Sequence, residues 1–180
     1  MPRLKALAAA LALLAASAAH AAAGEPLEYA VKAAYLSKFG FYVEWPKSAF
    51  NGPESPINLC VIGDDPFNNL LDEAVAGQQV EGRAIVVRRL KAVARDAGCH
   101  IAYVGGDARA PAVVDALRGT PTLVVTDGHG GGSAIGVIHF VLKDNRVRFT
   151  IDDEIAAQNG LAISSKLLSL ALNVKPRGGR

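Results

Sequence analysis

The sequence predicts an α/β fold in which a mostly parallel sheet is flanked by helices and carries an antiparallel C-terminal hairpin. Short, nearly continuous apolar runs alternate with helix-like segments, which is typical of buried parallel strands joined by crossover helices. These units recur about every 30 residues, as right-handed crossovers require. Two alternating runs, Val137 to Leu142 and Val147 to Ile151, then flank the turn-forming pair Asp144-Asn145.

The first residues are predicted to be a secretory leader rather than part of this domain. A basic start precedes the apolar run Leu7 to Ala16, which is too short to span a bilayer. Ala19-His20-Ala21 then has the form of a signal-peptidase site. We expect a signal peptide over residues 1–21, cleaved near 21–23, and a single domain over residues 24–176.

Removal of the leader changes the charge balance. Arg3 and Lys5 leave with it, so the 19 basic residues fall to 17, against 17 acidic residues. A nearly neutral mature chain has no electrostatic footprint for nucleic acid, and we expect no nucleic-acid partner.

The order of elements follows from apolar periodicity and from turn residues. From Glu25 to Val43 a broad apolar surface leaves only a narrow polar stripe, so this helix is expected to be buried or to lie at a partner interface. The expected strands are residues 57–63, 82–90, 99–105 and 121–127, with helices at 67–76 and 108–118 and a turn of helix within 91–98.

A two-residue loop at Asp144-Asn145 fixes the register of the hairpin. The pairs on the apolar side are Leu142 with Val147, Phe140 with Phe149 and Ile138 with Ile151, and on the mixed side Val141 with Arg148 and His139 with Thr150. Asp152-Asp153-Glu154 is then expected to start a helix that Asn159-Gly160 ends. A second helix is expected from Ser164-Ser165 to Pro176.

Cys60 and Cys99 both follow the leader, and an even number of cysteines in an exported chain favours a disulfide. The alternative is two separate buried thiols. A metal site is disfavoured because neither cysteine has a second cysteine or a suitably spaced histidine nearby.

No group of side chains has the spacing of a catalytic site. The loop Gly128 to Gly132 lacks the Lys and Ser/Thr of a phosphate-binding loop, and Ser164-Ser165-Lys166 lacks the S-x-x-K spacing. His139 is interpreted as a satisfied structural histidine. We expect no catalytic residue, no metal and no cofactor, which favours a binding protein over a hydrolase.

Several motifs extend over nearly the whole chain after the leader. They are Tyr29 to Leu36, Val43-Glu44-Trp45-Pro46, Leu59 to Gly63, Cys99 to Tyr103, Gly136 to Val141, Val147 to Ile151 and Gly160 to Ala171. Together these motifs resemble those of the YfiR family of small periplasmic proteins.

The resemblance implies a periplasmic repressor that holds an inner-membrane diguanylate cyclase inactive by binding its periplasmic sensor domain. Cyclic di-GMP signalling and biofilm formation would fall, and an outer-membrane lipoprotein is implied as a second partner. The resemblance also implies a disulfide between Cys60 and Cys99. A second cysteine pair of some members is absent, since Ala134 and Val141 stand near its place. We further expect a homodimer.

We expect the partner to bind the hairpin and the helix after it, with Phe149, Ile151, Asp153 and Ile163 as the partner-binding residues.

An alternative is a periplasmic small-molecule sensor. Its ligand would lie near the carboxyl ends of the parallel strands, around Asp64, Asp65 and Asp127.

Overall fold

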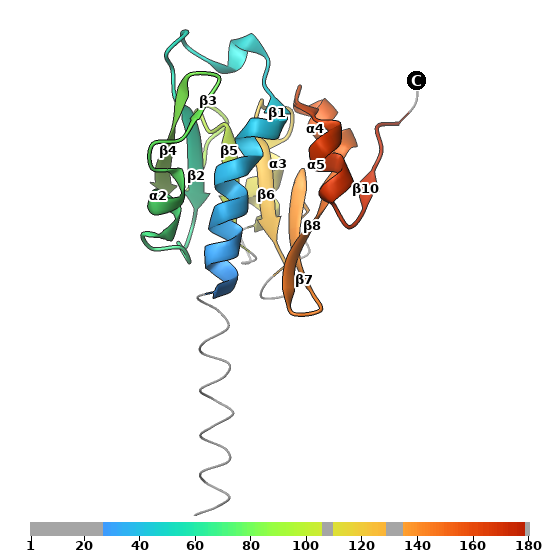
Figure 1. Ribbon diagram of the computed structural model, residues 1–180. Coiled ribbons are helices and arrows are strands. Elements are labelled where there is room, and N and C mark those ends of the chain that lie inside the picture. The colour runs from blue at the N-terminus through green and yellow to red at the C-terminus, as the bar shows by residue number, and fades with distance from the viewer. Residues whose placement is uncertain (1–26, 106–109, 129–134, 179–180) are drawn as a thin grey trace, which may run out of the picture.

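Within the residues that the computed structural model describes, 27–105, 110–128 and 135–178, eight strands form one sheet (Figure 1). Their order is β10-β8-β7-β6-β5-β2-β4-β3. The strands are β2 (Ile57–Ile62), β3 (Gln79–Val80), β4 (Arg83–Leu90), β5 (Ile101–Val104), β6 (Leu123–Asp127), β7 (Ile138–Lys143), β8 (Arg146–Asp152) and β10 (Val174–Lys175). A second sheet pairs β1 (Val43–Glu44) with β9 (Ala162–Ile163).

The centre of the large sheet is parallel, as the sequence predicts. β4, β2, β5, β6 and β7 pair in parallel, and β8 then runs antiparallel to β7. Every residue of β5 and β6 is buried, which is why β5 and the first three residues of β6 are apolar without alternation. The predicted fold class, a mostly parallel α/β sheet with an antiparallel hairpin, is confirmed.

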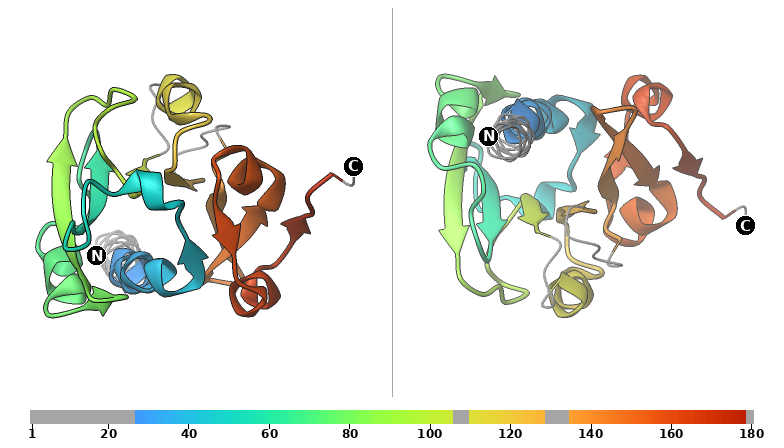
Figure 2. Two further views of the ribbon diagram at one scale, coloured as in Figure 1. Left: turned by 90° about the horizontal axis from the view of Figure 1, so that it is seen from above. Right: turned by 90° about the horizontal axis from the view of Figure 1, so that it is seen from below.

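The N-terminal helix, residues 27–39, lies on one face of the sheet, which curves around it (Figure 2). Leu36 and Phe39 are buried, and the Phe39 ring contacts Phe140 and Phe149 of the hairpin at centroid distances of 5.9 and 5.5 Å. The predicted end at Val43 was wrong. After residue 39 a 3-10 turn, Gly40–Tyr42, leads into β1, because the backbone of Val43 pairs with Ile163.

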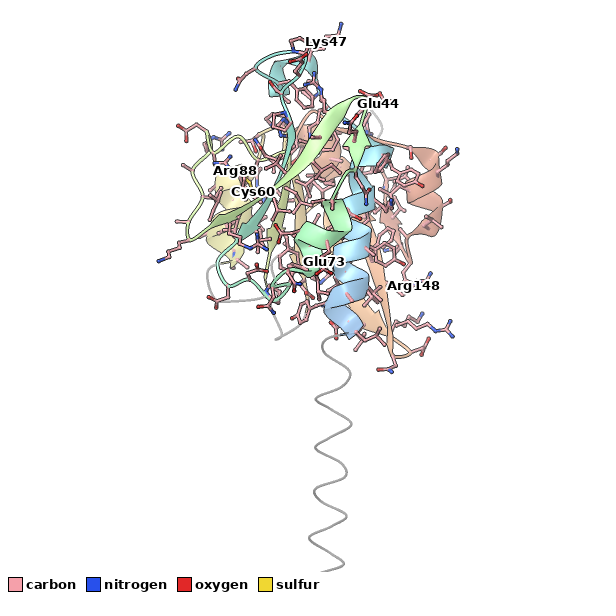
Figure 3. All side chains as sticks on the ribbon, turned by 60° about the vertical axis from the view of Figure 1, so that its left-hand side comes forward. Glu44, Lys47, Cys60, Glu73, Arg88 and Arg148 are labelled. Atoms are coloured by element: carbon pink, nitrogen blue, oxygen red, sulfur yellow. A yellow bond between two sulfur atoms is a disulfide. The ribbon has the colours of Figure 1, made fainter. Side chains whose placement is uncertain are left out.

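The opposite face carries α3 (Ala110–Leu117) and a second, smaller apolar cluster. Cys60 on β2 and Cys99 before β5 both belong to this cluster, and their sulfur atoms form a disulfide. Cys60 pairs with Arg88 of β4, and both residues are marked in Figure 3. The predicted disulfide is therefore present, and it joins the start of β5 to the centre of the sheet.

The predicted register of the hairpin is confirmed at every pair. Asp144 and Asn145 have φ values of 51° and 56°, the left-handed conformation that a two-residue loop of this type needs. Phe140 and Phe149 are buried on the side that meets the N-terminal helix. Leu142, on the same side, extends beyond the helix and is 55% exposed.

In the segment after the hairpin, the first helix starts where the sequence predicts, whereas the second helix ends earlier than predicted. α4 (Asp153–Gln158) begins where expected, since the Asp152 carboxylate accepts a hydrogen bond from the Ile155 amide. α5 (Ser165–Leu170) ends at Leu170, so the predicted end at Pro176 was wrong. The Leu172 amide donates instead to the Phe149 carbonyl, and the chain continues as β10 beside β8.

Two further predicted helices differ from the structure. No helix forms within residues 91–98, where the chain makes turns only. α2 (Leu70–Val75) starts three residues later than expected. Asn68 has a φ of 51°, and the Phe67 amide bonds to the Asp65 carboxylate in a turn, so this segment cannot be helical.

We predict that loss of the disulfide lowers stability without changing the fold. The bond closes a loop with a sequence separation of 39, and the chain-entropy model gives about 4 kcal/mol for a loop of this size. Cys60→Ala/Cys99→Ala should unfold at lower urea concentration than the oxidised protein. Reduced wild-type protein serves as the control and should match the variant. Equal midpoints for oxidised and reduced wild type would contradict the prediction.

Candidate functional site

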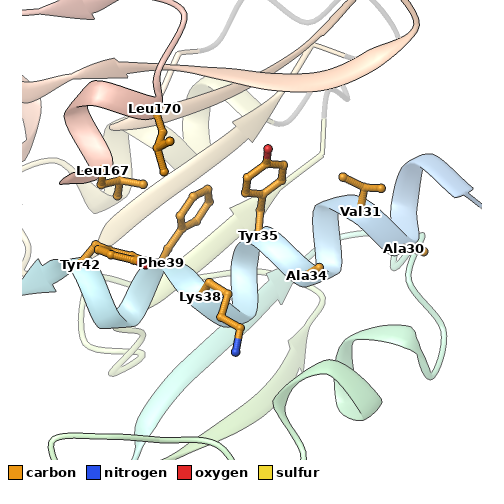
Figure 4. A pocket seen from close by; sticks show the side chains of 9 residues that line it. All are labelled: Ala30, Val31, Ala34, Tyr35, Lys38, Phe39, Tyr42, Leu167 and Leu170. Atoms are coloured by element: carbon orange, nitrogen blue, oxygen red, sulfur yellow. The ribbon is translucent and has the colours of Figure 1, made fainter.

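An open, apolar groove of about 510 Å³ runs between the N-terminal helix and α5 (Figure 4). The residues that line it are Ala30, Val31, Ala34, Tyr35, Lys38, Phe39, Tyr42, Leu167 and Leu170. All but Lys38 are apolar or aromatic. Leu170 is 56% exposed and Val31 is 37% exposed, so large apolar side chains meet solvent here. Exposed apolar surface that gathers in a groove is characteristic of a binding site.

The spacing of the N-terminal helix explains the shape of the groove. Val31, Tyr35 and Tyr42 recur at helical spacing and line one wall, whereas Ala30 and Ala34 are small and leave the space between. Tyr35 bridges the groove and the core, since its ring lies 5.4 Å from the Phe149 ring. The floor of the groove is therefore held by the hairpin.

The four residues predicted to bind a partner are all buried within the chain. Phe149 and Ile151 face inward on β8, and Ile163 on β9 pairs with Val43 of β1. Asp153 accepts two hydrogen bonds from the Arg177 guanidinium, one of them at 2.8 Å. Phe149 lies directly behind the groove. A partner that reaches this part of the molecule contacts the exposed groove residues first.

The sequence indicated the groove only indirectly. The narrow polar stripe of the first helix pointed to burial or to a partner interface, and the structure shows one side of the helix buried and another side lining an open apolar groove. Leu167 and Leu170 were not identified as groove residues. Their contribution depends on where α5 lies against the helix, which the spacing of α5 alone does not reveal.

A buried ionic cluster connects the start of the N-terminal helix to the end of β6. The Lys32 ammonium donates to the Asp127 carboxylate at 2.6 Å and to the Glu28 carboxylate one turn earlier. The side chains of Lys32 and Asp127 are each only 3% exposed. Lys32 of the polar stripe is therefore buried, because Asp127 faces it from the sheet, whereas Lys38 of the same stripe is exposed.

Tyr103 of β5 completes this cluster. Its hydroxyl donates to Asp127 at 2.7 Å, and burial, together with the nearby carboxylate, raises the pKa of the Tyr103 phenol. Asp127 thus accepts from an ammonium and a phenol at once. The cluster holds two elements together and has no nucleophile aligned with an oriented base.

The other carboxylates of the expected ligand site have different partners. Asp65 accepts from Arg89 at 2.6 Å and from the Phe67 amide. Asp64 lies exposed in the same turn and is also engaged. Asp65 and Asp127 are thus engaged by different cations, Arg89 and Lys32, rather than by a common one.

Both described histidines have structural contacts. His100 Nδ1 accepts from the Asn58 amide, so its Nε2–H donates to the Ala49 carbonyl. His139 Nδ1 lies 2.8 Å from the Thr126 hydroxyl. Burial lowers the pKa of both imidazoles.

The remaining features singled out in the sequence have structural explanations or lie outside the described residues. The Ser164 hydroxyl accepts from the Leu167 amide and caps α5, which accounts for that serine. The glycine-rich loop after Gly128, including residues 129–134, lies outside the described residues, as does the predicted leader. No helix of the described ranges combines the length and the apolar character needed to cross a membrane.

Comparison with known proteins identifies a family. A family model described as YfiR/HmsC-like matches residues 29–172, which is most of the chain and includes the groove, the hairpin and the ionic cluster except Glu28. No curated protein matches the chain.

We predict that Lys32→Met destabilises the fold by about 3–5 kcal/mol, because two carboxylates would remain buried without their cation. The matched control is Arg118→Met, which removes the cation of an exposed ion pair with Asp115 and should cost less than about 0.5 kcal/mol. Urea unfolding measures both. Adding Asp127→Leu to Lys32→Met should recover part of the loss, and equal effects of the two single variants would contradict the prediction.

We also predict that stability falls as the pH drops below about 6.5, the ordinary pKa of histidine. The lowered pKa values mean that the unfolded chain binds protons at a pH where folded His100 and His139 stay neutral. The contribution of these two histidines to the free energy of unfolding is complete above that pH and is lost as the pH falls below it. Urea unfolding from about pH 7 to about pH 5 should show a shallower slope for His100→Gln/His139→Gln. An unchanged slope would exclude this role.

Proposed function

The chain belongs to the YfiR/HmsC-like family, and from this premise we propose that it is an exported regulatory protein that represses an inner-membrane diguanylate cyclase. It binds the periplasmic sensor domain of that enzyme and holds it inactive, so cyclic di-GMP and biofilm formation fall. It acts through binding and not through catalysis. Residues 1–21 are removed as a signal peptide, and residues 24–176 form the periplasmic domain.

The observation that carries the binding role is the apolar groove. Its walls offer aromatic and aliphatic side chains, with Lys38 at the rim, where its ammonium lies 5.4 Å from the Phe41 ring centroid. Apolar side chains of the sensor domain fit such a surface, because burying apolar area drives most protein association. Tyr35 and Leu170 are the central contacts in this proposal.

The residues predicted from the sequence act behind this surface. Phe149 supports Tyr35 from below, and Ile163 holds β9 against β1 next to Tyr42. The Asp153–Arg177 pair ties the C-terminal segment to α4. We propose that Phe149, Ile151, Asp153 and Ile163 shape the partner-binding face, so that substitutions there weaken binding by distorting the groove.

A small-molecule sensor is the second candidate function. The polar cluster at the carboxyl ends of β5 and β6 favours it, since ligands of open α/β sheets bind at that edge. However, Lys32, Asp127 and Tyr103 already satisfy one another. The groove therefore supports a protein partner better. An outer-membrane lipoprotein that relieves the repression, and a homodimeric state, belong to the same proposal.

We predict that Val31→Asp abolishes repression while the matched variant Val86→Asp does not. Both valines are similarly exposed, at 37% and 42%, but Val86 lies on β4, away from the groove. A charge placed in an apolar interface should weaken capture of the sensor domain at least tenfold, or about 1.4 kcal/mol. Titration calorimetry with the purified sensor domain measures this, and cellular cyclic di-GMP should rise only for Val31→Asp.

Two results would count against the groove. One is a Val31→Asp variant that folds normally and still binds the sensor domain as tightly as wild type. The other is an equal loss for Val86→Asp, which would show that added charge anywhere disturbs binding. Failure of the wild-type protein to bind any sensor domain encoded beside it would refute the repressor role itself.

A further inference from the structure

The end of the hairpin carries a group of three cations. Lys143 and Arg146 are exposed and face each other across the turn, and Arg148 is half-buried on β8. None of the three has a carboxylate partner in the described part of the chain. Several other cations of the described residues are engaged by carboxylates or carbonyls, namely Arg83, Arg88, Arg89, Arg118, Lys175 and Arg177.

Several carboxylates near this end of the molecule are engaged by cations outside the hairpin, two carboxylates to each cation. Glu28 and Asp127 are engaged by Lys32, and Asp65 and Asp72 are engaged by Arg89. Asp144 in the turn is the exposed carboxylate that lies among the cations. At the hairpin tip itself three cations, Lys143, Arg146 and Arg148, stand against this one carboxylate, so the tip is formally positive, whereas the chain after its leader is close to neutral.

Exposed leucines lie at the same end of the molecule as these cations, with Leu142 on the other face of the hairpin. Leu142 precedes Lys143 and is 55% exposed, and Leu27 at the start of the N-terminal helix is also exposed. Figure 1 places the hairpin turn and the start of the helix at the same end of the molecule, opposite the β1–β9 sheet. A surface that combines cations with exposed leucines fits the boundary of an anionic bilayer, where phosphates meet acyl chains.

We propose that this end of the molecule, the hairpin tip formed by Leu142, Lys143, Arg146 and Arg148, docks on anionic phospholipid headgroups of a membrane surface. The cations contact lipid phosphates, and Leu142 enters the boundary between headgroups and acyl chains. This contact is independent of any protein partner. It orients the molecule with its strand ends toward the membrane and leaves the groove free at the side.

The charge argument favours lipid over an acidic protein surface. An acidic protein partner would pair the cations with fixed carboxylates. Such a contact makes no use of the exposed leucine next to the turn. A lipid surface uses both features at once. Weak attraction by a few cations also suits reversible docking rather than permanent anchoring.

The experiment uses the processed protein and vesicles of phosphatidylcholine, with or without phosphatidylglycerol. Mass spectrometry first confirms that the leader is absent, because its apolar run would bind vesicles by itself. Wild type should cosediment with phosphatidylglycerol vesicles only, and added salt should release it. Lys143→Gln/Arg146→Gln should weaken binding roughly thirtyfold, since each cation near an anionic surface is worth about fivefold.

The matched control is Lys47→Gln/Lys166→Gln, which removes the same charge from exposed positions elsewhere. Figure 3 shows Lys47 at the opposite end of the molecule from Arg148. The control should bind as wild type does, and Leu142→Ser should weaken binding without changing its salt dependence.

Three results would overturn the proposal. The first is failure of the wild type to bind phosphatidylglycerol vesicles. The second is a loss of binding by the control that equals the loss by the hairpin variant. The third is a hairpin variant that binds vesicles normally and fails to capture the sensor domain, which would assign the cations to a protein partner. The vesicles contain no protein, so binding to them does not depend on whether the chain represses a cyclase.

Discussion

The buried contact between Lys32 and Asp127 is the constraint on which the arrangement of this protein depends. It fixes the start of the N-terminal helix against the end of β6, at a place where both charges have lost their water. Such a pair adds little net stability over an apolar pair, but breaking it leaves an uncompensated buried charge. It therefore acts chiefly by excluding other placements of the helix, because in any other placement the two charges would lie unpaired in the core.

The position of the helix in turn creates the groove. One side of the helix packs Leu36 and Phe39 on the sheet, and the other side leaves Val31 open to solvent. Tyr35 lies between these two environments and contacts the hairpin through Phe149. A change in the position of the hairpin would therefore displace Tyr35 in the groove, because the two rings are in direct contact. Buried residues of β8 can influence the binding surface in this way although they do not line it.

The two proposed surfaces use different parts of the same hairpin. Its middle supports the groove from within, and its turn extends beyond the N-terminal helix with exposed cations. If the hairpin tip docks on a membrane, the groove lies on the side of the molecule and faces along the membrane. A sensor domain that extends from the same membrane would then lie next to the groove. The C-terminal segment, tied to α4 by Arg177, covers the outer edge of β8 and keeps that edge from pairing elsewhere.

The sequence by itself determined the local features of this protein. Continuous apolar runs gave the parallel strands, Asp144-Asn145 gave the hairpin and its register, and Asp152 gave the start of α4, because each depends on neighbours in the chain or directly across a turn. Only the tertiary structure decided the burial of Lys32, the end of α5 at Leu170 and the groove. Each of these depends on a residue far away in the sequence: Asp127 for Lys32, the Phe149 carbonyl for the chain after α5, and the N-terminal helix for Leu170. The spacing of residues along the chain predicts which side of a helix or strand each residue faces. The group that the residue contacts on that side is set by the packing of elements that are distant in the sequence.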